Sequence, residues 1–417
     1  MTNRLFFEVK PEYSAFEAIC KEQNEIGYYS LPEQDLGYLE QYKKDFYAKN
    51  KNVKHLVIIG IGGSSLGLKA IYRTLKTTKK FTKKIHFLES TDPIAIKSEL
   101  EKVELESAHF FVISKSGTTI ETTAIYKYIL GLLSEQKIDE DYMFTYVTDK
   151  GSLLEAHSKS KKSFCLNIPK NVGGRFSVLS AVGLAPLSLI EVDIKELLDG
   201  AKQIKNSFLK NGYLKDILLK KATYYAKNSM KYNINTLFVY SESFKYFTEW
   251  YVQLWGESLG KKQLNSSFNV GLTPVGITGP KDQHSFLQLI VDGFRDKSVT
   301  VLKIRNFNYD IKIPDINLKE LESLDSINKL SFNSLINLQA DSVIEALVDK
   351  GDIPVDTIEL ECIDEENIGK FIFYYELLTS LVANLIGVEA YGQPGVEESK
   401  IILKNKLSKE RSLYENY

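Results

Sequence analysis

The stretch HLVIIGIGGSSLG, residues 55–67, decides the fold, because a strand-like apolar run passes directly into a turn of glycines and serines. Such a turn exposes backbone N–H groups at the start of a helix, where they can bind a phosphate. The third glycine of a dinucleotide-binding G-x-G-x-x-G motif would fall at Ser65, and no Lys-Ser/Thr pair follows as in a triphosphate P-loop. The stretch alone therefore predicts either a generic anion site or a tight turn capped by serine.

Outward from this turn, short runs rich in β-branched and aromatic residues alternate with helix-like patterns. The predicted strands are 55–59, 84–89, 109–113, 143–148 and 163–168, followed by 236–241, 299–304 and 357–362. The predicted helices are 120–133, a helical stretch around 184–229, and 244–258, 284–293, roughly 328–348 and 371–388. This alternation predicts an α/β fold with mainly parallel sheets, each sandwiched by helices.

The alternation falls into two series, so the sequence predicts two α/β domains in tandem with helical segments at both ends. We expect an N-terminal helical segment over 1–50, a first domain over 51–185 and a second domain over 186–385. A loop and helix over 386–417 complete the prediction. A chain of 417 residues is also longer than one ordinary domain.

Composition excludes several classes of protein. The 53 lysines and arginines nearly balance 54 aspartates and glutamates, which does not favour a general nucleic-acid binder. No apolar run approaches the roughly 20 residues of a membrane span, and the first residues lack a signal-peptide pattern. The three cysteines are too far apart for a zinc motif or a disulfide framework, and no histidines and carboxylates cluster at metal-ligand spacing. We therefore expect a soluble cytoplasmic protein without a cofactor, metal, membrane or nucleic-acid partner.

A second loop, ISKSGTTIET at 113–122, narrows the interpretation of the first. It follows another predicted strand and supplies the side chains of Ser114, Lys115, Ser116, Thr118, Thr119 and Thr122. Hydroxyl groups and a lysine at a helix start form a cradle for a phosphate monoester. A capping turn would explain one or two of these side chains but not six. Both loops leave the carboxyl ends of parallel strands, where α/β sheets bind ligands, so we expect one shared phosphate site.

Four further segments carry candidate functional side chains. Arg175 follows two glycines in GGRFS, where a guanidinium can hold a phosphate or stabilise an oxyanion. Glu257 continues the apolar face of its predicted helix and is a candidate base, while His284 opens a helix after a Gly- and Pro-rich loop. Gln393 lies in a Gly-Gln-Pro-Gly turn and Lys400 in the helix after it. Taken singly, each also has an ordinary structural or surface interpretation.

Together and in this order, the six segments resemble the phosphoglucose isomerase family over roughly residues 55–400. The resemblance implies two sugar-isomerase (SIS) domains in a homodimer with active sites at the subunit interface. It implies that Glu257 is the base, that Arg175 lies near the reacting carbons, and that His284 and Lys400 open the sugar ring. The residues implied to bind the substrate's phosphate are Ser64, Ser114, Lys115, Ser116, Thr119 and Thr122, with Gly62, Gly63 and Gln393 as further substrate contacts.

The resemblance also implies a reaction, the reversible conversion of glucose 6-phosphate to fructose 6-phosphate through a cis-enediol, without a metal. Two positions depart from the family pattern, Gly117 where many long members have an aromatic residue and Gly392 where an aspartate is common. Three alternatives stay open: an isomerase of mannose or amino-sugar phosphates, a non-catalytic sugar-phosphate-binding protein, and a dinucleotide-dependent oxidoreductase. The last is possible because Glu89 stands after the second predicted strand.

Overall fold

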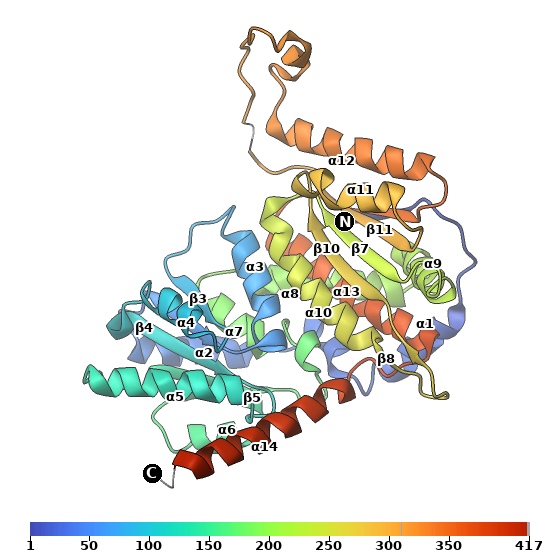
Figure 1. The fold of residues 1–417 in the computed structure, drawn as a ribbon. Helices are drawn as coiled ribbons and strands as arrows, with labels where there is room; N and C mark the ends of the chain where they lie inside the picture. Colours follow the sequence, from blue (N-terminus) through green and yellow to red (C-terminus); the bar gives the residue numbers. More distant parts are fainter. Residues whose placement is uncertain (310, 415–417) are drawn as a thin grey trace.

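Two β-sheets, each covered by helices, form the body of the molecule (Figure 1). The computed structural model describes residues 1–309 and 311–414. Helices α3 (Leu66–Leu75) and α10 (Lys245–Leu259) pack against each other between the two sheets (Figure 1). Within the described residues, no helix is long and apolar enough to cross a lipid bilayer.

The first sheet is entirely parallel. Its strand order is β3 (Lys84–Leu88), β2 (His55–Ile59), β4 (Ala108–Ile113), β5 (Phe144–Asp149) and β6 (Phe164–Ile168). Every residue of β2 is buried, and because successive side chains point to opposite faces, alternate residues of β2 pack in two different cores. The covering helices are α2 (Gly37–Lys49), α3 and α7 (Ala181–Leu189) on one face, and α4 (Pro93–Leu100), α5 (Ile120–Glu135) and α6 (Leu153–Ser158) on the other.

The second sheet is parallel except for one edge strand. Its order is β1 (Thr2–Leu5), β12 (Val355–Leu360), β11 (Lys297–Ile304), β7 (Ile234–Val239) and β10 (Thr273–Thr278), with β1 antiparallel. Helices α11 (Phe286–Asp292) and α12 (Phe332–Asp349) cover one face, and α9 (Tyr213–Lys227), α10 and α13 (Glu365–Ile386) the other. The remaining elements are α1 (Tyr13–Glu22), α8 (Ile194–Leu209) packed on α13, the ribbon of β8 (Lys261–Lys262) and β9 (Asn269–Val270), and α14 (Glu397–Tyr414).

The structure confirms the predicted fold class, and all eight predicted strands are present with ends shifted by two residues at most. Among the described residues, two strands of these sheets were missed, as were the two short strands β8 and β9 outside them. Strand β10 contains Pro274 and Gly276, which weaken a strand pattern, but it lies at the sheet edge, where proline is tolerated. Strand β1 lies in the N-terminal segment that we expected to be helical; that segment contains α1 and α2 but begins with a strand.

A buried polar network ties β1 to the sheet. Lys221 Nζ lies 2.7 Å from Asp356 Oδ2, and the two side chains are 0% and 1% exposed. Asn3 of β1 donates to the same carboxylate oxygen at 2.8 Å, and Thr300 donates to the other oxygen at 2.7 Å. A buried ion pair is tolerated only when its remaining polar atoms are satisfied, so β1 completes a network that the core requires.

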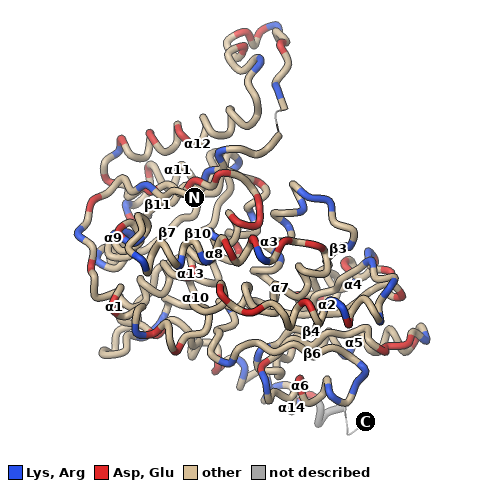
Figure 2. Tube along the Cα trace, turned by 180° about the vertical axis from the view of Figure 1, so that it is seen from behind, with Lys and Arg blue, Asp and Glu red and all other residues tan. Residues whose placement is uncertain are grey.

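Charges of both signs are distributed over the surface. Figure 2 shows lysines and arginines interspersed with aspartates and glutamates over most of the chain, while the loop between α3 and β3 carries only lysines among its charged residues. Many pair locally, as Lys54 does with Glu104 at 3.0 Å and Lys162 with Asp141 at 2.5 Å. Exposed pairs of this kind contribute little stability, about 0–1 kcal/mol each, so the fold depends on its buried contacts.

His109 of β4 makes stability depend on pH. Its side chain is fully buried with Nε2 2.7 Å from Thr145 Oγ1, and burial lowers the pKa of His109 to about 3. The unfolded chain binds a proton near pH 6.5 that the folded chain binds only near pH 3. The stability that the neutral ring provides is therefore complete above pH 6.5 and is lost as the pH falls toward 3, by about 1.4 kcal/mol per pH unit.

We expect His109→Phe to remove this loss, because phenylalanine does not titrate and keeps the ring contacts with Phe46 and Phe111. Urea denaturation at pH 7, 6 and 5 measures it: the free energy of unfolding should fall less steeply in the variant below pH 6.5. Identical slopes in both proteins would show that His109 does not cause the pH dependence.

Candidate active site

The first glycine loop and the arginine loop touch through their backbones. Gly62 has φ +59°, a conformation that favours glycine. A Cβ atom on Gly63 would lie 2.4 Å from the carbonyl oxygen of Gly174, so only glycine fits. The 3₁₀ turns η2 (Gly62–Ser64) and η4 (Gly174–Phe176) therefore lie against each other beyond the carboxyl end of β2.

The second loop lies beside the first because β2 and β4 are neighbours in the sheet. A Cβ atom on Gly60 would lie 3.2 Å from the carbonyl oxygen of Ile113, the last residue of β4. The two loops that the sequence predicted to share a site thus leave adjacent strands at the same edge.

Hydroxyl groups gather within the second loop. Ser114 Oγ lies 2.8 Å from Thr119 Oγ1, and Ser116 Oγ lies 3.0 Å from Thr118 Oγ1. Thr122 Oγ1 is buried and has no hydrogen-bond partner among the residues that the structure describes. The loop therefore holds a cluster of hydroxyls, and the buried hydroxyl of Thr122 beside them is unpartnered within the described chain.

Two details of this loop were not predicted. Lys115 donates to the backbone carbonyl of Lys170 at 3.1 Å and lies 3.8 Å from Asp149, so its ammonium is held at the loop's edge. Gly117 has φ +70°, and a Cβ atom there would lie 2.8 Å from the backbone nitrogen of Leu154. In this conformation the loop requires glycine at the position where many long family members carry an aromatic residue.

Arg175 is the most buried charge of the site, with its residue only 4% exposed. Its Nε donates to Ser258 Oγ at 2.7 Å, and its Nη1 lies 3.3 Å from Glu257 Oε1. Its Nη2 donates to the carbonyl oxygens of Ala390 and Gly392. Burial lowers the pKa of Arg175 from its ordinary value, while Glu257 opposes that shift. The guanidinium is thus fixed at the edge of the site, beside the candidate base.

Glu257 stands near the end of α10, as predicted, on a helix that buries Phe247, Trp250 and Leu254. Its side chain is 22% exposed. Gln253, one turn earlier, donates from Nε2 to Glu257 Oε2 at 3.1 Å. Both carboxylate oxygens of Glu257 therefore have a neighbouring donor group, one from Arg175 and one from Gln253.

Sequence reasoning missed Gln253. The same Nε2 atom lies 2.8 Å from where a Cβ atom on Gly62 would stand, so Gln253 contacts the glycine loop as well as Glu257. The available signal was its spacing, because residues four apart on a helix are neighbours on its surface.

A cavity of about 620 Å³ opens beside Glu257. Its lining includes Glu257, Lys261 and Gln393, which come from α10, β8 and the turn before α14. The volume is in the range of pockets that bind small metabolites. The structure thus brings Glu257, Arg175 and Gln393 to one place.

His284 and Lys400 lie outside that cavity. His284 is exposed at the end of the 3₁₀ turn η6 (Lys281–His284). Lys400 is exposed on α14, where its Nζ lies 2.7 Å from Glu397 Oε1. Figure 1 shows α14 running along the outside of the molecule, and its residues 397–410 are all exposed.

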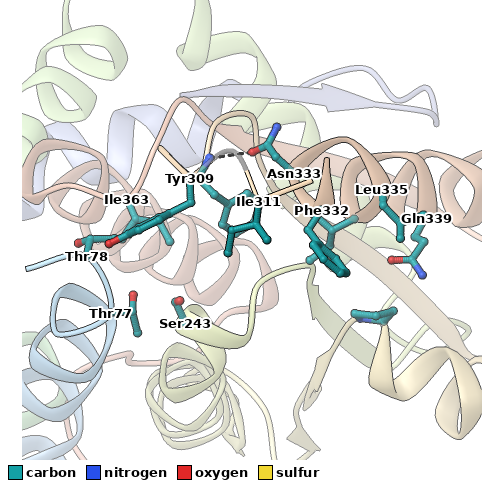
Figure 3. Close-up of a pocket in the computed structure, with 13 residues that line it drawn as sticks. Thr77, Thr78, Ser243, Tyr309, Ile311, Phe332, Asn333, Leu335, Gln339 and Ile363 are labelled. Atoms are coloured by element: carbon teal, nitrogen blue, oxygen red, sulfur yellow. Dashed lines mark hydrogen bonds between the residues drawn. The ribbon is translucent and has the colours of Figure 1, made fainter. Parts of the chain in front are cut away.

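Another cavity, with a mainly apolar lining, lies elsewhere. It has a volume of about 480 Å³ and is lined by Tyr309, Ile311, Phe332 and other residues where the segment between β11 and α12 meets the end of α3 (Figure 3). None of the predicted site residues lines it. The cavity lined by Glu257 and Lys261, rather than this one, has the groups needed for acid–base chemistry.

Gly63 gives a direct test of the contact between the glycine loop and the arginine loop. We expect Gly63→Ala to lower the free energy of unfolding by about 1–3 kcal/mol, because the new methyl group meets rigid backbone at Gly174. Gly131→Ala on α5 is the control, since no atom lies within 4 Å of its Cβ position and alanine should raise stability by up to about 1 kcal/mol. Urea denaturation measures both; equal effects would contradict the contact.

The fold and the loops define an α/β protein of the kind that holds a phosphorylated ligand beyond the carboxyl ends of parallel strands, with an acid–base group beside it. The sequence model of the family described as phosphoglucose isomerase matches residues 45–413. Glucose-6-phosphate isomerase of Campylobacter jejuni is 40% identical over 414 residues, covering 98% of this chain and 100% of that protein. The chain belongs to the phosphoglucose isomerase family.

Solved structures agree on the fold. The crystal structure of a hypothetical protein from Thermus thermophilus is 30% identical, with a TM-score of 0.86 and coverage of 94% of both chains. That of a glucose-6-phosphate isomerase from Chlamydia trachomatis is 24% identical with a TM-score of 0.77, covering 97% of this chain and 76% of that chain.

Proposed function

We propose that the protein is a glucose-6-phosphate isomerase, an aldose–ketose isomerase that interconverts glucose 6-phosphate and fructose 6-phosphate. The observation that carries the proposal is the setting of Glu257. Its carboxylate lines the cavity, lies 3.3 Å from Arg175 Nη1, and accepts from Gln253 at 3.1 Å. A fixed carboxylate beside a fixed cation is suited to moving a proton between adjacent carbons while negative charge develops on oxygen.

In the proposed reaction Glu257 takes the proton from carbon 2 of the open-chain sugar and returns it to carbon 1. One carboxylate suffices because both carbons present the same face in a cis-enediol. Arg175 stabilises the charge that develops on the enediol oxygens. The reaction moves a proton within one substrate, so it needs neither a redox cofactor nor a metal ion.

The phosphate of the substrate is proposed to bind at the two loops, at a distance from the reacting carbons. The groups that would hold it are the glycine loop around Gly62 and Gly63 and the side chains of Ser64, Ser114, Lys115, Ser116, Thr119 and Thr122. The free hydroxyl of Thr122 and the backbone N–H groups at the start of α3 support this assignment. Gln393, across the cavity, would contact the sugar.

Ring opening is proposed for His284 and Lys400, and a second copy of the chain is proposed to complete the site. Both side chains are exposed and neither lines the cavity over Glu257. Helix α14 also leaves Ile401, Ile402 and Leu407 between 46% and 61% exposed, which is unfavourable in water unless a partner covers them. A symmetric homodimer would bury such a face and bring His284 to the partner's site.

The compartment we propose is the cytoplasm. All three cysteines are free, as expected where thiols are kept reduced. Neither nucleic acid nor a membrane enters the proposed function.

Other substrates and activities are less well supported. A non-catalytic binding protein would not need Arg175 and Glu257 held together at 3.3 Å. Glu89, the residue that would hold the ribose of a dinucleotide, instead accepts from Lys69. Mannose 6-phosphate and amino-sugar phosphates share the chemistry of the site, and a substrate panel in the isomerase assay distinguishes them.

Glu257→Gln tests the base. We expect kcat to fall by about 10²–10⁴-fold with a small change in KM for fructose 6-phosphate, because glutamine keeps the volume but cannot accept the proton. Formation of glucose 6-phosphate, coupled to its dehydrogenase, measures the rate. Glu249→Gln on the same helix is the control, since its carboxylate pairs with Lys69 at 3.2 Å and not with Arg175. A variant at 257 that keeps its kcat would exclude the proposed role.

Complementation tests the shared site. Glu257→Gln and His284→Ala chains, each inactive alone, are co-expressed with different tags. If His284 acts in the partner's site, half of the mixed dimers' sites are intact and about one quarter of wild-type activity returns in the mixture. No recovery, with mixed dimers isolated through both tags, would place the two residues of one site in the same chain.

A further inference from the structure

The loop over 387–393, between α13 and the turn before α14, carries Gln393 to the cavity and is held by charged side chains from distant segments. Arg175 donates to the carbonyls of Ala390 and Gly392. On the far side, Tyr391 OH lies 3.0 Å from Ser380 Oγ. The side chains of Arg175 and Ser380 therefore fix this loop. The proposed reaction uses Arg175 only to stabilise charge and gives Ser380 no role.

Lys261 is the second cation on the loop. It begins β8, after Gly260 at the end of α10 and four residues after Glu257, and its side chain is only 6% exposed. Its Nζ donates to the Gly392 carbonyl at 2.6 Å and to the Glu389 carbonyl. Because Arg175 Nη2 donates to the same Gly392 carbonyl at 3.0 Å, two cations share one acceptor.

Glu389 supplies the compensating charge. Its carboxylate lies 3.6 Å from Lys261 Nζ and accepts from the backbone N–H groups of Tyr391 and Gly392, each at 2.6 Å. A Cβ atom on Gly392 would lie 2.8 Å from Glu389 Oε2, so the carboxylate occupies the space that a side chain at 392 would fill.

Opposing effects act on the charge of Lys261. Burial and the neighbouring Arg175 lower the pKa of Lys261, and Glu389 and Glu257 oppose that shift. Without Glu389, the buried Arg175 and the neighbouring Lys261 would face Glu257 alone, and their repulsion would separate them from the shared carbonyl.

We propose that Lys261 and Glu389 are a positioning pair for the isomerase: they fix the loop over 387–393 so that Gln393 and the guanidinium of Arg175 stand correctly over Glu257. The pair does not touch the reacting carbons. The expected effect on kcat rests on the proposed function, whereas the expected effect on the order of the loop over 387–393 does not.

Kinetics test the consequence for catalysis. Lys261→Met should lower kcat about 10- to 100-fold, as expected for a misplaced catalytic group. KM for fructose 6-phosphate should stay within about threefold, because the phosphate loops are untouched. Lys261→Arg should recover most of kcat, and Lys245→Met, at the start of α10 where its Nζ pairs with Glu242, should leave it unchanged. Equal effects at 261 and 245, or a loss confined to KM, would overturn the proposal.

Relocating the carboxylate tests the pair itself. Glu389→Ala should lower kcat, and Gly392→Asp alone should also lower it, because its Cβ would stand 2.8 Å from the resident carboxylate. The double variant removes the clash and returns a carboxylate to the same space, so its kcat should exceed that of either single variant. A double variant no better than the worse single variant would contradict the pairing.

Hydrogen exchange separates this inference from the proposed function. In Lys261→Met and Glu389→Ala, the peptide containing Tyr391 and Gly392 should exchange its amides at least about fivefold faster than in wild type, with exchange in β2 unchanged. Faster exchange in a protein without isomerase activity would support the positioning pair and refute the activity. Unchanged exchange in an active isomerase would refute the positioning pair alone.

Discussion

The guanidinium of Arg175 joins three segments that are far apart in the sequence. It lies in the turn after the first sheet, contacts Glu257 and Ser258 at the end of α10, and donates to the carbonyls of Ala390 and Gly392. A buried cation is stable only when nearly every donor finds an acceptor, so these segments cannot move apart without leaving a charge unpaired. The glycine contact between Gly63 and Gly174 fixes the loop that carries it. The geometry over Glu257 depends on that single group.

Much of the fold could be predicted because its strands are continuous apolar runs. Strands such as β2 and β4, buried on both faces, differ clearly from the helices between them. The two edge strands of the second sheet lack that signal: β10 carries a proline and a glycine, and β1 is a short strand whose Asn3 bonds to Asp356, far away in the sequence. Sequence patterns report local periodicity, and such long-range partners lie outside it.

The site residues also differ in whether a local sequence pattern could reveal them. The hydroxyl loop and the glycine loop are local motifs, and the sequence located both because all their groups lie within a few residues. Gln253, Lys261 and Glu389 matter through the atoms they meet across the fold, and a lone glutamine, lysine or glutamate has no local pattern to distinguish it. The ring-opening roles of His284 and Lys400 were implied by the resemblance, and a single chain leaves both exposed at the surface.

The largest hydrophobic core is continuous from one sheet to the other. It includes Leu56 of β2 and Leu237 of β7, with Leu68 of α3 and Leu254 of α10 among the residues between them. The two sheets share no strands, but they pack against one continuous apolar core. Separating them would expose that apolar surface to water, which is unfavourable. Neither half therefore unfolds alone at low cost, and the described body is expected to behave as one cooperative unit. We therefore expect flexibility for substrate entry in loops at the edge of this body and not in a hinge between two lobes.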